Sequence, residues 1–127
     1  MKTLKLSETE IDRAVERAIA RIPSEIRHHL KNIVISVQKR PSKEILEEMG
    51  LHRNEPLLGM YRGTSLMDRS VFYPPLYPDT IILFQEPLEE MCNTIDELEE
   101  QIEITVVHEI AHFLGMSEEK LAELGYG

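Results

Sequence analysis

Two spacings of hydrophobic residues alternate along this chain. Apolar residues recur every three or four positions over residues 11–22 and 95–114, the spacing of helices that bury one side. Between them lie short runs rich in β-branched or aromatic residues, at 33–37, 57–62, 71–73 and 80–84, and these favour strands. The pattern predicts an α+β fold with a small mixed sheet of about four strands.

Capping signals fix where the helices begin. Ser7 with Glu10, and Thr94 with Glu97, have the spacing of a capping box, in which the two residues satisfy each other's backbone amides. Shorter helices are expected at 25–31, 43–49, 87–91 and 118–124, the last one capped by Ser117. The first strand, 33–37, reads as buried, and 57–62 and 71–73 could pair as a hairpin.

The helix expected over 95–114 has an unusual distribution of apolar residues. In its second half, further apolar side chains add a second buried flank, so only the face carrying His108 and His112 stays open. This distribution suits a core helix that borders a cleft. The main stripe consists of Ile95, Leu98, Ile102, Val106, Ile110 and Phe113, and the second flank of Ile104, Val107 and Leu114.

His108 and His112 are the candidate metal ligands. Side chains four residues apart on a helix point the same way, so these two imidazoles can converge on one ion. Glu109 lies one step round the helix from His108, where a carboxylate can accept a proton from a metal-activated water. The spacing H-E-x-x-H therefore indicates a Zn²⁺ site with a catalytic base.

A catalytic zinc ion normally has three protein ligands, and the sequence offers a third. Gly115 can take the left-handed conformation that ends a helix, which would let Glu118 swing back toward the ion. Glu119 and Glu123 compete for this role. Glu118 also has an ordinary explanation, since carboxylates are favoured in the first turn of a helix.

The pattern H-E-x-x-H-x-x-G-x-x-E at residues 108–118 resembles the zincin superfamily, and within it the short bacterial zincin-like metallopeptidase family. Residues 58–63, 78–84 and 123–126 are similar to other recurrent stretches of that family, so the resemblance spans roughly 30–127. It implies one compact metallopeptidase domain over 1–127, with His108, His112 and Glu118 as zinc ligands and Glu109 as base. It also implies a sheet edge that aligns a peptide substrate.

The resemblance has limits. Metzincins carry a His where this chain has Glu118, followed by a Met-turn, and the nine residues after Glu118 leave no space for that turn or for the late glutamate of gluzincins. We therefore expect a reduced zincin with its own substrate pocket.

Charge is distributed unevenly in this chain of 127 residues, which has a net charge of −9. Residues 1–69 carry 13 basic and 10 acidic side chains, whereas residues 70–127 carry 1 and 13. An acidic field around the candidate site would attract Zn²⁺ and basic peptide or protein substrates and repel nucleic acid. A solvated acidic face that maintains solubility explains the same numbers.

Other features point to a cytoplasmic protein without a membrane segment. The N-terminus lacks the apolar run of a signal peptide, no stretch is long enough to span a bilayer, and the single cysteine, Cys92, reads as a core residue. His28 and His29 are expected to be exposed, and His52 to have no role in the site. The proline-rich stretch 74–78 is expected to be a stiff loop, and Tyr126 to pack on the body of the domain.

Three hypotheses follow. The first is zinc-dependent hydrolysis of peptide bonds, with Glu109 as the proton carrier. The second is a non-catalytic metal-binding or protein-interaction domain that keeps a zincin fold, suggested by the short chain. The third is a plain α+β domain whose histidines bind no metal.

Overall fold

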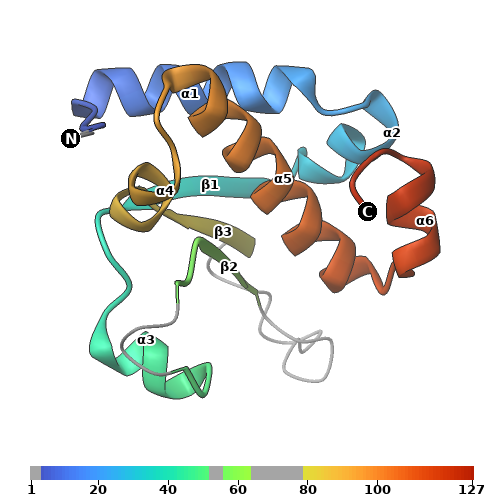
Figure 1. Ribbon diagram of the computed structural model, residues 1–127. Coiled ribbons are helices and arrows are strands. Elements are labelled where there is room, and N and C mark those ends of the chain that lie inside the picture. The colour runs from blue at the N-terminus through green and yellow to red at the C-terminus, as the bar shows by residue number, and fades with distance from the viewer. Residues whose placement is uncertain (1–3, 52–55, 64–78) are drawn as a thin grey trace.

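The computed structural model describes residues 4–51, 56–63 and 79–127 of the chain, which form a small sheet with helices on both faces (Figure 1). The α+β class predicted from the sequence is confirmed. The elements are α1 (Glu8–Arg21), α2 (Ser24–Arg27), the 3-10 turn η1 (His28–Leu30), β1 (Ile33–Gln38), α3 (Lys43–Glu48), β2 (Gly59–Arg62), β3 (Asp79–Phe84), α4 (Gln85–Met91), α5 (Ile95–Leu114) and α6 (Glu118–Glu123).

The sheet is mixed and has the strand order β1-β3-β2. β1 runs parallel to β3, with Ile33 opposite Asp79, and β2 runs antiparallel to β3, with Gly59 opposite Leu83. Three strands are found among the described residues, against about four expected. The fourth, at 71–73, and its hairpin with 57–62 lie outside the described residues, and β2 pairs with β3 instead.

β3 is the central strand, and its alternating side chains serve two separate cores. Ile81 and Leu83 belong to the main hydrophobic cluster beneath α1 and α5. Ile82 and Phe84 belong to a smaller cluster on the other face, against which Ile45 of α3 packs. Both faces of β3 are therefore covered, which explains why this strand has the most continuous apolar sequence.

β1 differs from its prediction. It was expected to be buried, but it lies at the edge of the sheet, its residues are only partly covered, and Val34 is 46% exposed. The reason is that α1 packs on α5 rather than on β1. A β-branched run reports strand propensity, and it does not say where in the sheet the strand will lie.

α5 is the helix on which the core is built. The middle of its predicted stripe is confirmed, because Leu98, Ile102, Val106 and Ile110 are at most 1% exposed. Each such side chain contributes roughly 1.5–3 kcal/mol by burial. On the predicted second flank Val107 is fully buried, but Ile104 is only partly buried and Leu114 is 40% exposed, so that prediction is right for Val107 alone. The two ends of the stripe are not buried: Ile95 is 39% exposed and Phe113 52%.

Both ends of α5 follow the predicted signals. The Thr94 side chain accepts a hydrogen bond from the Glu97 amide at 3.1 Å, which is one half of the predicted capping box. The Glu97 carboxylate accepts from the Asn93 amide at 3.3 Å instead of from the Thr94 amide. At the other end Gly115 has φ 70°, and the amides of Gly115 and Met116 donate to the carbonyls of His112 and Ala111 at 3.1 and 2.9 Å. Only a residue that tolerates positive φ closes a helix in this way, so the chain turns sharply into α6.

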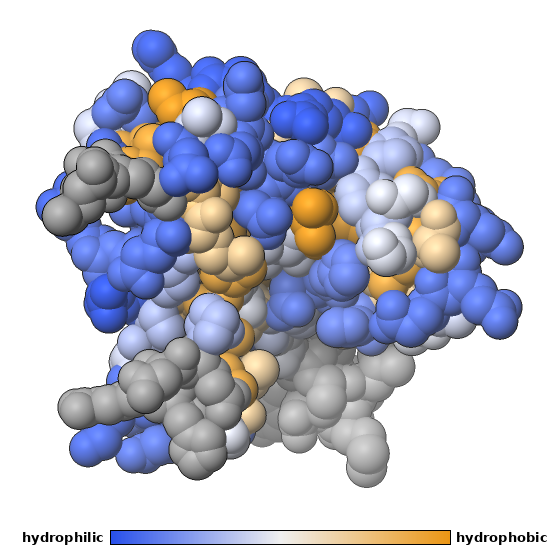
Figure 2. Space-filling model, viewed as in Figure 1, coloured by the Kyte–Doolittle hydropathy of each residue, from blue (hydrophilic) through white to orange (hydrophobic). Residues whose placement is uncertain are grey.

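Ion pairs hold α1 across α5. Arg17 contacts Glu99 at 3.0 Å and Arg21 contacts Glu103 at 3.1 Å, and both carboxylates are largely shielded from solvent. The face of the molecule shown in Figure 2 is mostly hydrophilic, with hydrophobic residues in separate areas. The thiol of Cys92 is fully buried, as predicted. No helix in the described ranges has both the length and the apolar character needed to span a bilayer.

Gly59 allows β2 to approach α5 closely. A Cβ atom at this position would lie 2.8 Å from Thr105 Cγ2 and 3.0 Å from the carbonyl oxygen of Ile82. Both contacts are shorter than van der Waals separation. The glycine therefore determines how near the edge strand comes to the helix that carries the candidate site.

We expect Gly59→Ala to lower the free energy of unfolding by about 1–3 kcal/mol, because the added methyl group overpacks the contact with Thr105. Urea unfolding followed by circular dichroism measures this change. In a Thr105→Ser background the clashing Cγ2 is gone while the hydroxyl bond to the Gln101 carbonyl can remain, so the cost should fall. An equal cost in both backgrounds would show that the contact with Thr105 is not the reason for the glycine.

Candidate active site

His108 and His112 lie one turn apart near the C-terminal end of α5, on the face that the two buried flanks leave uncovered. Their ring centroids are 6.3 Å apart and the ring planes meet at 80°. His108 is partly buried, whereas the His112 side chain is 62% exposed. The structure therefore brings the two predicted ligands to one side of the helix, at the surface.

The spacing of the two rings fits a shared metal ion with a small adjustment. Two imidazoles bound to one tetrahedral zinc ion at about 2.0–2.1 Å have their centroids about 5 Å apart. The observed 6.3 Å is wider than this, and rotation of the exposed His112 side chain can close the difference. Two imidazole nitrogens are also a donor set that zinc prefers. The histidine pair thus fits zinc in chemistry and nearly in geometry.

The Tyr126 carbonyl orients the His108 ring. His108 Nε2 lies 2.8 Å from this oxygen. Because a carbonyl oxygen can only accept, Nε2 must carry the proton and Nδ1 keeps its lone pair. Histidines that bind metals usually donate their other ring N–H to such an acceptor. The contact therefore leaves one nitrogen of His108 available for an ion and fixes which one it is.

Glu109 lies between the histidines and the sheet. One of its carboxylate oxygens is 3.9 Å from His112 Nδ1, and the side chain is 21% exposed. Burial raises the pKa of Glu109, while His112, a hydrogen bond from the Tyr61 backbone amide and His108 act in the opposite direction. A carboxylate that is partly withdrawn from water and held by an amide has the character of a positioned base.

Tyr61 of β2 was not singled out from the sequence, yet it makes three contacts around the site. Its amide binds Glu109, its ring stacks on Phe113 with centroids 4.3 Å apart, and its hydroxyl donates to Asp79 at 2.6 Å. The stack explains why Phe113 can remain half exposed at the end of the apolar stripe. The available signal was the family-like stretch 58–63, which did not indicate what its tyrosine touches.

The hydrogen-bond pattern of β2 shows which way its backbone faces. The Phe84 amide donates to the Leu58 carbonyl at 2.9 Å, so Leu58 faces β3. Backbone groups alternate along an antiparallel strand, and Gly59 and Tyr61 therefore face away from β3. The bond from Tyr61 to Glu109 agrees with this alternation. Among the described residues, β2 is thus the edge strand of the sheet that borders the candidate site.

The proposed third ligand is separate from the histidine pair. Glu118 is the first residue of α6 and is exposed, as are its competitors Glu119 and Glu123. Over residues 4–51, 56–63 and 79–127, no group of three or more His, Cys, Asp or Glu side chains is arranged to hold a metal ion. Ser117 caps α6, so first-turn preference accounts for Glu118 as it stands. Its role as a ligand stays a prediction.

The phenol of Tyr126 is engaged by Glu103 of α5. It donates to Glu103 Oε2 at 2.6 Å, and burial together with this bond raises the pKa of Tyr126. The expectation that Tyr126 packs on the body of the domain is confirmed. His28 and His29 are exposed, also as expected, whereas His52 and the stretch 74–78 lie outside the described residues.

A small cavity of about 230 Å³ adjoins His108 and Glu109. One wall is the face of α5 that carries His108, extended toward the N-terminus of the helix by Gln101 and Thr105. The other wall is the start of β2. The site therefore combines a two-histidine face, a held carboxylate, a strand edge and a shallow recess.

Comparison with known proteins gives a family and a fold. The family described as zincin-like metallopeptidase matches residues 30–127. Among solved structures, a conserved hypothetical protein from Thermus thermophilus is similar, with a TM-score of 0.56 and 20% identity, over 91% of this chain and 96% of that one. At this identity the likeness shows the fold alone. None of the curated proteins matches the chain significantly.

In the metal-free protein, we expect His108 to carry its proton on Nε2, because that nitrogen faces the Tyr126 carbonyl. Long-range proton–nitrogen NMR above the imidazole pKa of about 6.5 distinguishes the two tautomers. His28 and His29 are exposed and serve as controls that should show a mixture. A proton found mainly on Nδ1 of His108 would contradict this arrangement.

Proposed function

Because the chain belongs to the zincin-like metallopeptidase family, as the match over residues 30–127 shows, we propose that it is a zinc-dependent peptidase. The observation that carries the proposal is the position of Glu109. This carboxylate lies beside His112 on α5 and accepts a hydrogen bond from the Tyr61 amide of the edge strand. Two imidazoles, a base and a strand edge are the parts that metal-assisted hydrolysis of a peptide requires.

In this proposal His108 and His112 hold the zinc ion and Glu118 is the third ligand. A bound zinc ion lowers the pKa of its water to about 7 and polarises a carbonyl group. Glu109 takes one proton from the attacking water at its carboxylate as the new carbon–oxygen bond forms. It then delivers that proton to the amine nitrogen when the carbon–nitrogen bond breaks. The Tyr61 amide keeps the carboxylate in place for both transfers.

The proposed substrate is a peptide in extended conformation. The backbone of Gly59 faces away from β3, so a peptide can align along β2 by main-chain hydrogen bonding. One substrate side chain would enter the cavity of about 230 Å³ beside Glu109, which Leu58 and Ile104 help to line. A recess of this size accommodates a side chain rather than a folded partner, which favours peptide segments over intact domains.

The alternative is a non-catalytic zincin domain that binds a metal ion or a protein partner. One observation favours it: in the part of the chain that the structure describes, no third donor joins the two histidines. A site with two imidazoles and no third protein ligand would bind zinc weakly and would not order a water for attack. The two proposals differ in what Glu109 does, because only the peptidase needs its carboxylate.

Replacing Glu109 with Gln should lower kcat/KM for peptide hydrolysis by at least about 100-fold. The variant loses the carboxylate that carries the proton, while the size and shape of the side chain are kept. Cleavage of fluorogenic peptides, with lysine- and arginine-containing sequences among them, measures the rate, and metal analysis measures zinc content. Glu100→Gln, at an exposed position on the same helix, is the matched control. Parent-like cleavage by the Glu109 variant would rule out the mechanism.

Zinc binding should require both histidines and Glu118. We expect His108→Ala, His112→Ala and Glu118→Gln each to weaken zinc binding at least about tenfold, since a ligand is lost from a three-ligand site. Calorimetric titration of the metal-free protein measures the affinity. Glu119→Gln and Glu123→Gln are the controls.

Two outcomes would change the assignment. Equal zinc affinity in the parent and both histidine variants would rule out a zinc site at His108 and His112. If Glu119→Gln or Glu123→Gln weakened zinc binding while Glu118→Gln bound zinc like the parent, the third ligand would be that glutamate and not Glu118.

A further inference from the structure

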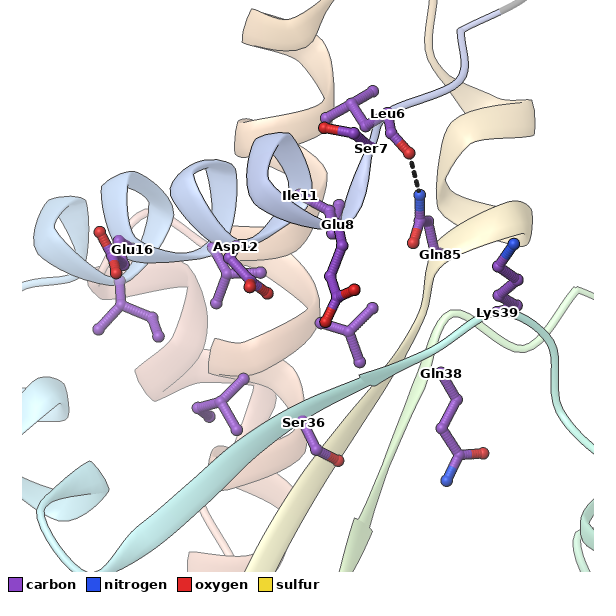
Figure 3. A pocket seen from close by; sticks show the side chains of 14 residues that line it. Leu6, Ser7, Glu8, Ile11, Asp12, Glu16, Ser36, Gln38, Lys39 and Gln85 are labelled. Carbon is purple, nitrogen blue, oxygen red and sulfur yellow. Dashed lines mark hydrogen bonds between the residues drawn. The ribbon is translucent and has the colours of Figure 1, made fainter.

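A groove of about 760 Å³ lies between α1 and β1, on the far side of the sheet from β2 (Figure 3). None of His108, Glu109 and His112 lines it. Its existence follows from the packing, because α1 rests on α5 and leaves the edge of β1 uncovered. The groove is therefore separate from the candidate active site.

The groove runs along the edge of a strand. Residues 35–39 line it without interruption. Side chains of consecutive strand residues point to opposite faces of a sheet, so a cavity that touches five in a row lies against the backbone edge. Among the described residues β1 pairs with β3 alone. The exposed edge and the groove are one feature.

The floor of the groove is apolar and only partly covered. Ile35 and Val37 of β1, with Ile19 of α1, are half-buried side chains that pack against the main core. Ile11 and Val15 lie deeper on the α1 side. Such a floor can accept apolar side chains that an added strand turns toward α1.

The rim formed by α1 is acidic. Glu8, Asp12 and Glu16 recur every four residues on one side of the helix and are exposed. In Figure 3 the carboxylates of Glu8 and Asp12 extend from α1 toward β1. None of the three forms an ion pair within the described residues, whereas Arg17 and Arg21 are engaged by α5. Within the described part of the chain, Lys39 is the one basic residue of the lining, at the end of the groove near Gln85.

The edge of β1 lacks the usual protection against pairing. Edge strands are normally guarded by a charged residue, a proline or a bulge, but β1 reads Ile-Val-Ile-Ser-Val-Gln with regular pairing over all six residues. A second copy of the chain is a poor occupant, because pairing of two β1 edges would bring two acidic rims together. The rim favours a cation-bearing partner.

We propose that this groove binds an extended peptide as a strand added to β1, with apolar and lysine or arginine side chains together on the face that the peptide turns toward α1. Its backbone pairs with the β1 edge. On the face toward α1, its apolar side chains lie on Ile35 and Val37, and its cationic side chains reach the carboxylates of Glu8, Asp12 and Glu16. This binding requires neither zinc nor hydrolysis at the active site.

A labelled peptide of about eight residues, with valine and lysine in turn at every second position and threonine between them, tests the proposal by fluorescence anisotropy with the full chain, because its valines and lysines then share one face. We expect binding, and about tenfold weaker binding by the triple variant Glu8→Gln, Asp12→Asn, Glu16→Gln. The triple variant Glu44→Gln, Glu47→Gln, Glu100→Gln changes the net charge equally at exposed positions outside the groove and should bind like the parent. The same peptide with glutamate in place of lysine should not bind.

Hydrogen exchange locates the peptide, because strand addition should slow exchange of amides within residues 35–39 while leaving those of β2 unchanged. Absence of binding, equal loss in both triple variants, or protection at β2 instead of β1 would overturn the proposal. A concentration-dependent dimer with protected β1 amides and no peptide, detected by analytical ultracentrifugation, would assign the edge to a second copy and would also overturn it.

Discussion

Burial of one stripe of α5 determines most of what this domain presents to solvent. Leu98, Ile102, Val106 and Ile110 fix the rotation of the helix against α1 and the sheet, because turning it would expose them. With Val107 also buried, one face remains, and it carries His108 and His112. The placement of both imidazoles on this open face is thus a consequence of core packing, while the exposed His112 ring still has to rotate before the two can share an ion.

A second set of contacts links this core to His108 from the other end of the chain. Arg21 of α1 pairs with Glu103 of α5, Glu103 accepts the Tyr126 hydroxyl, and the Tyr126 carbonyl meets His108. The same tyrosine therefore holds its place through its phenol and orients an imidazole through its backbone. Residues of α1, of α5 and of the C-terminus therefore act together on the His108 ring, although Arg21 and Tyr126 lie far apart in the sequence.

Local signals predicted local structure well. The capping box at Ser7, the left-handed Gly115 and the shared face of His108 and His112 each depend on residues a few positions apart, and each is found. What depends on distant pairing was out of reach: the place of β1 at an edge, and the contact of the Tyr61 amide with Glu109. A strand's neutral backbone atoms carry no sequence signature, and so the partner of a backbone amide cannot be predicted from residue types.

The distribution of charge along the sequence differs most clearly from its distribution in the folded domain. The acidic excess of residues 70–127 suggested an acidic field around the candidate site, yet several of these carboxylates meet arginines from the basic part of the chain: Glu99 with Arg17, Glu103 with Arg21, and Glu86 and Glu90 with Arg40. Glu8, Asp12 and Glu16 of α1 have no ion pair among the described residues, although this helix lies in the part of the chain that is basic on average. Substrate attraction by charge therefore has to be argued from the carboxylates that face a groove, and net charge along the sequence is a poor guide to where a cationic peptide will bind.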